Sequence, residues 1–194
     1  MSPVVYLVAS VALCIGCASS SQSSAQSAPA PAASSNEGAE LFYGAGYSFM
    51  LESAPGWSCA CGDAAPEGVE GLFAPTTGDA AQPVVLVTVS PRDETTAPAD
   101  FLRSEIARAK EDAGGTALVN DEAPVTLTDG RTITLETVAR PDGARVTLAF
   151  VPESSVFVGV ILSADDENAY RVGSVALRKI LASYRFVSKD VSIP

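Results

Sequence analysis

The stretch that most constrains the fold is residues 83–90 (PVVLVTVS), because it is apolar on both faces of an extended strand. Valine or leucine fills positions 84–87, and Val89 follows. A strand of this kind lies at the centre of a sheet that is covered on both sides. Residues 155–163 (SVFVGVILS) have the same character. We therefore expect a layered domain with a buried sheet.

Most of the chain after residue 40 shows the twofold alternation of strands. Alternating or apolar runs predict further strands at 47–52, 57–61, 69–74, 116–127, 131–139 and 144–152. Pro55-Gly56 is a turn signal, and Asp129-Gly130 and Asp142-Gly143 are typical of hairpin connections. These turns favour strands that run antiparallel to their neighbours.

In two segments the apolar residues recur about every 3.6 positions instead, which predicts helices. Residues 97–113 follow Thr96, which we expect to be the N-cap, and stop at Gly114-Gly115. Residues 165–184 have acidic side chains in the first turn and basic ones near the end, as the helix dipole favours. Antiparallel strands interrupted by only two helices predict an α+β fold, an antiparallel sheet flanked by helices in an α/β/α sandwich.

The N-terminus predicts an export signal. Residues 4–16 form an apolar run directly before Cys17, and a helix of this length spans about 20 Å, which is short of the roughly 30 Å core of a bilayer. Residues 14–17 resemble the bacterial lipobox, with two departures: Cys14 stands at the aliphatic position, and no Lys or Arg precedes the run. We expect a signal peptide at 1–16 and lipidation of Cys17, with an ordinary secreted protein as the alternative.

A disordered tether is expected between this signal and the folded domain. Residues 18–36 contain only small side chains, polar uncharged side chains and proline, which cannot bury enough surface to fold. We assign 17–39 to the lipidated cysteine and tether and 40–194 to the domain. A lipidated cysteine followed by such a spacer resembles the mature start of outer-membrane lipoproteins. This resemblance implies a bacterial envelope protein, held by its lipid at the outer membrane on the periplasmic or the surface face.

Composition excludes several functions. The net charge of -11 would repel a phosphate backbone, so we expect no nucleic-acid partner. The chain has no histidine, which removes the triads and zinc sites that depend on it. The sequence carries no recognised catalytic or cofactor motif, and we predict a protein that is not an enzyme and binds no cofactor.

The ends of the predicted domain resemble a known family. Gly46-Tyr47-Ser48-Phe49 followed by Pro55-Gly56-Trp57 is similar to the opening of PsbP-like domains, and residues 181–186 (LASYRF) look like the family's closing segment. The fold is that of a photosystem II extrinsic subunit and of a Ran-binding import factor, and the family includes many bacterial lipoproteins. The resemblance implies a binding or assembly-supporting module. We expect it to use its acidic first half, or a sheet edge, against an unidentified envelope protein.

Cys59 and Cys61 are the strongest candidates in the sequence for a chemical role. Residues two apart on a strand face the same way with Cα atoms about 6.6 Å apart, near the upper limit for a disulfide. The pair therefore predicts a disulfide, two reduced thiols, or a thiol-redox or copper-handling site that Met50 would complete. Trp57, two residues earlier, is interpreted as a core anchor, with the lining of a ligand groove as the alternative.

Overall fold

The structure, a computed structural model, describes residues 38–77, 82–93 and 95–188. The expectations for the signal peptide, for Cys17 and for the tether up to residue 37 lie outside the described residues. The strands are β1 (Ala39–Gly44), β2 (Tyr47–Glu52), β3 (Trp57–Cys61), β4 (Gly71–Pro75), β5 (Val84–Pro91), β6 (Leu118–Thr126), β7 (Thr132–Ala139), β8 (Arg145–Pro152), β9 (Val156–Ala164) and β10 (Arg185–Ser188). The helices are α1 (Pro98–Asp112) and α2 (Glu167–Ala182), and a short 3-10 helix covers Gly62–Ala64.

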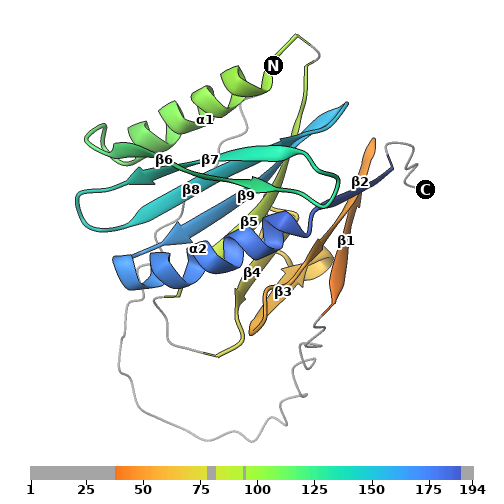
Figure 1. Ribbon diagram of the computed structural model, residues 1–194, viewed down its shortest axis with the longest axis horizontal. Coiled ribbons are helices and arrows are strands. Elements are labelled where there is room, and N and C mark those ends of the chain that lie inside the picture. Colours follow the sequence, from red (N-terminus) through yellow and green to blue (C-terminus); the bar gives the residue numbers. More distant parts are fainter. Residues whose placement is uncertain (1–37, 78–81, 94, 189–194) are drawn as a thin grey trace, which may run out of the picture. The chain divides into compact units, whose positions relative to one another are not determined.

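Seven strands form the main sheet in the order β3-β4-β5-β9-β8-β7-β6, and each pairs antiparallel with its neighbours. The two strands that are apolar on both faces, β5 and β9, lie near the middle of the sheet, as predicted, and the structure pairs them with each other. Helix α1 packs against β7 and β8, and α2 packs against β9, β5 and β6 (Figure 1). The predicted α+β fold with helices flanking an antiparallel sheet is confirmed.

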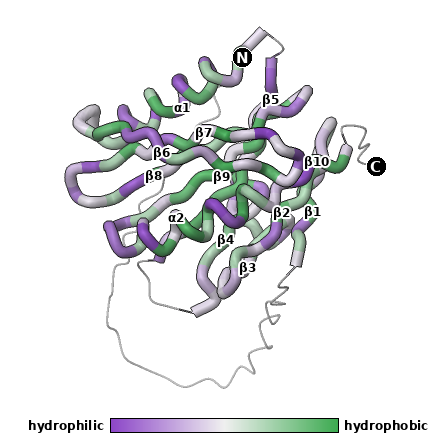
Figure 2. Tube along the Cα trace, viewed as in Figure 1, coloured by the Kyte–Doolittle hydropathy of each residue, from purple (hydrophilic) through white to green (hydrophobic). Residues whose placement is uncertain are grey.

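The two faces of this sheet belong to separate cores. On one face, Ile106 of α1 packs with Val138 and Leu148. On the other face, a larger core joins the sheet to α2 and to the first two strands. Figure 2 shows why the sheet can be covered on both faces. The tube is hydrophobic along most of β9, whereas both helices alternate between hydrophobic and hydrophilic residues. Each helix therefore buries one side and leaves the other to water.

A second sheet of three strands, in the order β1-β2-β10, closes the larger core. Phe49 in its central strand stacks on Phe42 of β1 and on Tyr184, with ring centroids 5.0 and 5.5 Å apart. Tyr184 is completely buried, and its hydroxyl donates to Glu153 at 2.8 Å. The aromatic residues at both ends of the predicted domain thus meet in one cluster.

Several expected boundaries are wrong. Thr96 does not cap α1: Ala97, which directly precedes Pro98, is the N-cap and has no side-chain cap, because a residue before proline favours extended backbone. Helix α2 ends at Ala182, so Tyr184 lies beyond it. The expected break at Pro124 in β6 is present, as a shift of register between Glu122 and Val125. No helix of the described residues is long and apolar enough to cross a membrane.

Candidate functional site

The candidate site is a hollow of about 400 Å³ between α2 and the turn that joins β2 to β3. We call it the α2 groove. Its lining consists of Ala54, Pro55 and Trp57 from the turn and of Arg171, Val172, Val175, Ala176 and Lys179 from the helix. Its volume lies within the range of ligand-binding pockets, but the hollow is open to solvent and not enclosed.

The turn wall of the α2 groove is fixed by its local sequence. The backbone amide of Trp57 donates to the carbonyl of Ala54 at 2.9 Å, and Gly56 between them has a φ of 76°. Proline at the second position and glycine with positive φ at the third are typical of a type II turn. Trp57 is only 6% exposed and belongs to the larger core, so it forms a rigid floor. Trp57 is thus buried in the larger core and also lines the α2 groove, and its role toward a ligand stays a prediction.

The helix wall is held against the sheet at its middle by a glycine. A Cβ at Gly173 would lie 2.5 Å from a methyl carbon of Leu162 and 2.7 Å from Pro83, so only glycine permits this approach. Next to it, the Tyr170 hydroxyl donates to the Glu122 carboxylate at 2.6 Å. Burial raises the pKa of Tyr170, and this hydrogen bond to Glu122 raises it further.

Three more hydrogen bonds hold the C-terminal half of α2 and the residue that follows it. Arg178 donates to the carbonyl of Ala123 at 2.6 Å. Beyond the last turn, the hydroxyl of Ser183 accepts from the backbone amide of Glu52 at 2.8 Å and donates to the carbonyl of Ile180 at 2.6 Å. The Ser-Tyr pair of the closing segment thus ties the helix to β2 and places the outer side of α2 beside the turn.

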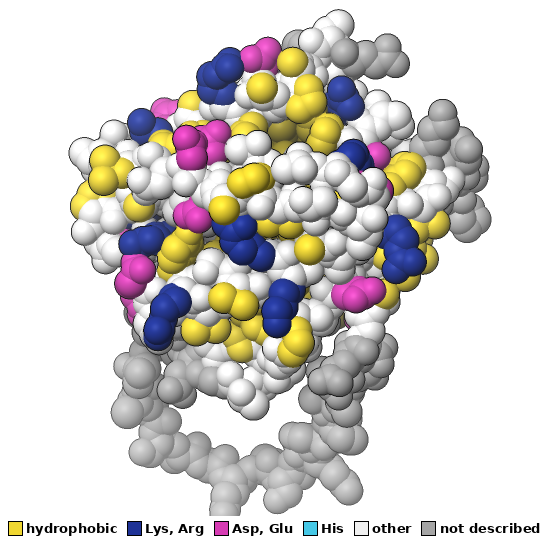
Figure 3. Space-filling view, in the orientation of Figure 1, with side chains coloured by type: hydrophobic (Ala, Val, Ile, Leu, Met, Phe, Trp, Pro, Cys, Tyr) yellow, Lys and Arg dark blue, Asp and Glu magenta, His cyan; other side chains and the backbone are white. Residues whose placement is uncertain are grey.

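The charges that line the α2 groove are all positive. Arg171 and Lys179 are exposed, and no acidic side chain lines the groove. Between them, Val172 and Val175 are 48% and 57% exposed. In Figure 3, hydrophobic side chains lie between dark blue basic ones over α2. Glu52 is the acidic residue closest in sequence to the turn wall. It lines an adjoining hollow that shares Ala54 and Pro55 with the α2 groove, and it pairs with Arg185.

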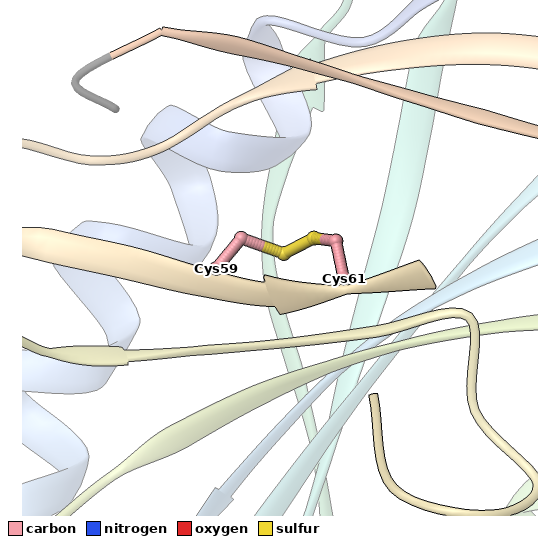
Figure 4. The surroundings of a disulfide bond; sticks show 2 residues. All are labelled: Cys59 and Cys61. Carbon is pink, nitrogen blue, oxygen red and sulfur yellow. A yellow bond between two sulfur atoms is a disulfide. The ribbon is translucent and has the colours of Figure 1, made fainter. Parts of the chain in front are cut away.

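The second predicted site lies on the edge strand β3. The structure joins Cys59 and Cys61 in a disulfide, with the bridge running along one face of the strand (Figure 4). Their Cα atoms are 5.4 Å apart, less than expected for a flat strand. Gly71 lies opposite, where a Cβ would approach the two sulfurs to 3.0 and 3.2 Å. Both cysteines pack against the larger core and are still partly exposed.

Met50 is not brought together with these sulfurs. Its neighbours Phe49 and Leu51 are fully buried in the larger core, against which the cysteines pack. Because side chains alternate along a strand, Met50 points to the other face of the small sheet. Among the described residues, the His, Cys, Asp and Glu side chains form no group of three that could hold a metal ion.

Sequence reasoning missed the helix wall of the α2 groove. The residues were inside the predicted second helix, but only its buried stripe was interpreted. The available signal was a pair of valines, Val172 and Val175, that lie off this stripe and between two basic residues. Nothing in the sequence indicated that this side of the helix faces Trp57.

No protein-family model matches the sequence, and no curated protein matches it. Several solved structures are similar, and two of them show the extent of the likeness. Cyanobacterial PsbP (CyanoP) from Synechocystis sp. PCC 6803 has a TM-score of 0.50 and 12% identity, over 78% of this chain and 94% of that one. LpqN of Mycobacterium tuberculosis, described as involved in cell envelope biogenesis, has a TM-score of 0.49 and 14% identity, over 72% of this chain and 83% of that one. The expected resemblance in fold is confirmed, and the domain has a PsbP-like α+β fold.

Proposed function

We propose that the chain is a non-enzymatic lipoprotein of the bacterial cell envelope whose PsbP-like domain binds a protein partner. The leader and the residues around Cys17 support export and lipid attachment, and the charge-free spacer supports a domain held clear of the outer membrane. The intact mass of the mature protein tests this part. It should lack residues 1–16 and carry a diacylglycerol group, and a soluble product cleaved elsewhere contradicts the anchor.

The observation that carries the binding role is the α2 groove. Val172 and Val175 leave an apolar surface in water between two cations, on the exposed side of a helix whose other side is buried. An exposed apolar strip with a polar rim is typical of interaction sites. The groove differs in sign from the acidic half that the sequence suggested as the binding surface. We therefore place the partner at α2 and not at that acidic surface.

Site-specific photocrosslinking in the producing cells tests the binding role. A photoreactive residue at Val175 should give a discrete adduct with an envelope protein, identified by mass spectrometry. The matched control is the same residue at Ala107, which is exposed on α1 across the sheet. Adducts that are identical at the two positions, or none at either, contradict a binding role for the groove.

A second candidate function is thiol exchange at Cys59 and Cys61. Their partial exposure on an edge strand supports it, since a partner thiolate needs access to a sulfur. In this reaction a partner dithiol would become a disulfide while the bridge becomes two thiols. Mild reduction should then let a thiol reagent label both cysteines in the folded protein. Labelling only after unfolding contradicts this role. The copper-handling alternative would require ligands beyond this pair, because Met50 faces away.

A further inference from the structure

The two cations of the α2 groove have a defined separation. Arg171 and Lys179 are eight positions apart, which corresponds to about 12 Å along a helix. Val172, Val175 and Ala176 lie between them on the same side. This is the separation of the two backbone positions, and a ligand that meets both side chains would carry two negative charges at about this spacing, with an apolar group in the middle.

Neither cation is neutralised by a described carboxylate. Arg171 donates to the neutral side chain of Asn168 at 3.0 Å. Seven other arginines of the described residues lie within 4.0 Å of a carboxylate: Arg103, Arg108, Arg131, Arg140, Arg145, Arg178 and Arg185. In a chain of net charge -11, a groove whose charged lining residues are all cations is complementary to an anionic partner.

We infer that the α2 groove takes an extended acidic peptide segment of the partner protein, with carboxylates four residues apart. This inference rests on the proposed binding function. Four residues of extended chain span about 13 Å, which matches the separation of Arg171 and Lys179. The apolar side chains between the two acids lie over Val172 and Val175, with Trp57 beneath them. A fatty acid carries a single carboxylate and would use only one of the cations.

The single tryptophan of the chain provides the assay, because Trp57 lines the groove. The probe is a capped peptide Asp-Val-Leu-Val-Asp, titrated into the full mature chain while Trp57 emission and calorimetric heat are recorded. The comparison peptides replace both Asp residues by Asn, or move the second Asp to two residues from the first. We expect binding of the first peptide that weakens with salt, and weaker binding of both comparison peptides.

The variants distinguish a loss of affinity caused by the groove from one caused by the change in net charge. Arg171→Gln/Lys179→Gln should weaken binding of the probe about 5- to 20-fold, as two partly exposed ion pairs are lost. The matched control Arg103→Gln/Lys110→Gln removes the same charge from α1 and should change the affinity less than about twofold. Val175→Ser should also weaken binding. All substituted side chains except Lys110 are exposed, and thermal unfolding verifies that each variant is folded.

Each alternative outcome overturns the inference. It fails if neither emission nor heat detects the acidic peptide, if the Asn peptide binds equally, or if the α1 control loses as much affinity as the groove variant. Binding of laurate or of phosphatidylcholine vesicles with one quarter phosphatidylglycerol, in place of the peptide, indicates a lipid ligand and also overturns it. If the peptide fails while crosslinking at Val175 still captures a partner protein, the proposed function stands and only this inference is lost.

Discussion

Gly71→Ala tests how the Cys59–Cys61 bridge fits into the core. An added Cβ would lie 2.8 Å from a ring carbon of Phe42 and 3.0 and 3.2 Å from the sulfurs of Cys61 and Cys59. Phe42 is buried and stacked on Phe49, so its ring has little room to move. The structure therefore predicts overpacking at this position.

The expected cost follows from two opposing effects. Overpacking of a filled core costs about 1 to 3 kcal/mol. Replacing glycine by alanine recovers about 0.4 to 1 kcal/mol, because the unfolded chain loses freedom. Gly71→Ala should thus lower the free energy of unfolding by about 1 to 2 kcal/mol. In a Cys59→Ala/Cys61→Ala background the two contacts with sulfur are absent, and the cost should fall but not vanish, because the closest contact, with Phe42, remains.

Urea unfolding followed by Trp57 emission measures the cost of Gly71→Ala in both backgrounds, since Trp57 is buried at the start of β3, the strand that carries the two cysteines. With a slope of about 2 kcal/mol per molar, the midpoint should fall by about 0.5 to 1 M. A double-mutant cycle then gives the coupling between Gly71 and the cysteines. An unchanged midpoint, or the same loss in both backgrounds, refutes the argument that glycine is required here by the bridge.

Three further predictions concern stability. Cys59→Ala/Cys61→Ala should cost about 1.5 kcal/mol in urea unfolding, because the bridge closes a loop of only three residues; a loss above about 4 kcal/mol contradicts the short-loop argument. Tyr170→Phe should cost about 1.5 to 3 kcal/mol by removing a hydrogen bond to a charged acceptor, whereas the exposed control Tyr43→Phe should change stability by less than about 0.5 kcal/mol. Burial and the nearby Glu153 raise the pKa of Tyr184 above its usual value of 10.0. Above pH 10 the unfolded chain therefore releases a proton that the native state keeps, and the free energy of unfolding falls as the pH rises. Tyr184→Phe should make this fall shallower by up to about 1.4 kcal/mol per pH unit in unfolding measured from pH 9 to 12, and an identical slope contradicts the assignment.

The sheet was predictable from the sequence because its signals are local. Residues 83–90 and 155–163 are apolar on both faces, and they became the paired strands β5 and β9. The two short strands β1 and β10 were missed for different reasons. In β1, Leu41 and Tyr43 point outward and hide the alternation, and β10 follows α2 with no glycine or proline between them. The amino-acid pattern alone therefore did not show that α2 stops at Ala182.

The α2 groove was less predictable because it depends on contacts between distant segments. Trp57 was a candidate from its position after a Pro-Gly turn, but its partners Arg171 and Lys179 come from a helix more than a hundred residues later. The rotation of that helix is set by Gly173 and Tyr170, whose contacts involve β6, β9 and Pro83, the residue before β5. Such packing is decided by shape and not by residue spacing.

The small sheet also has a consequence for how the chain acquires its structure. Its central strand, β2, lies between β1, which precedes it directly, and β10, whose Ser188 accepts a hydrogen bond from Ser48, 140 positions earlier in the chain. Until β10 has left the ribosome, and in an exported chain the translocation channel, Phe49 lacks the stacked ring of Tyr184. Contacts of such long range form late, and the waiting apolar strands are prone to pair with other chains. The hairpin β1–β2 is therefore the segment for which a holding chaperone would matter most during biogenesis.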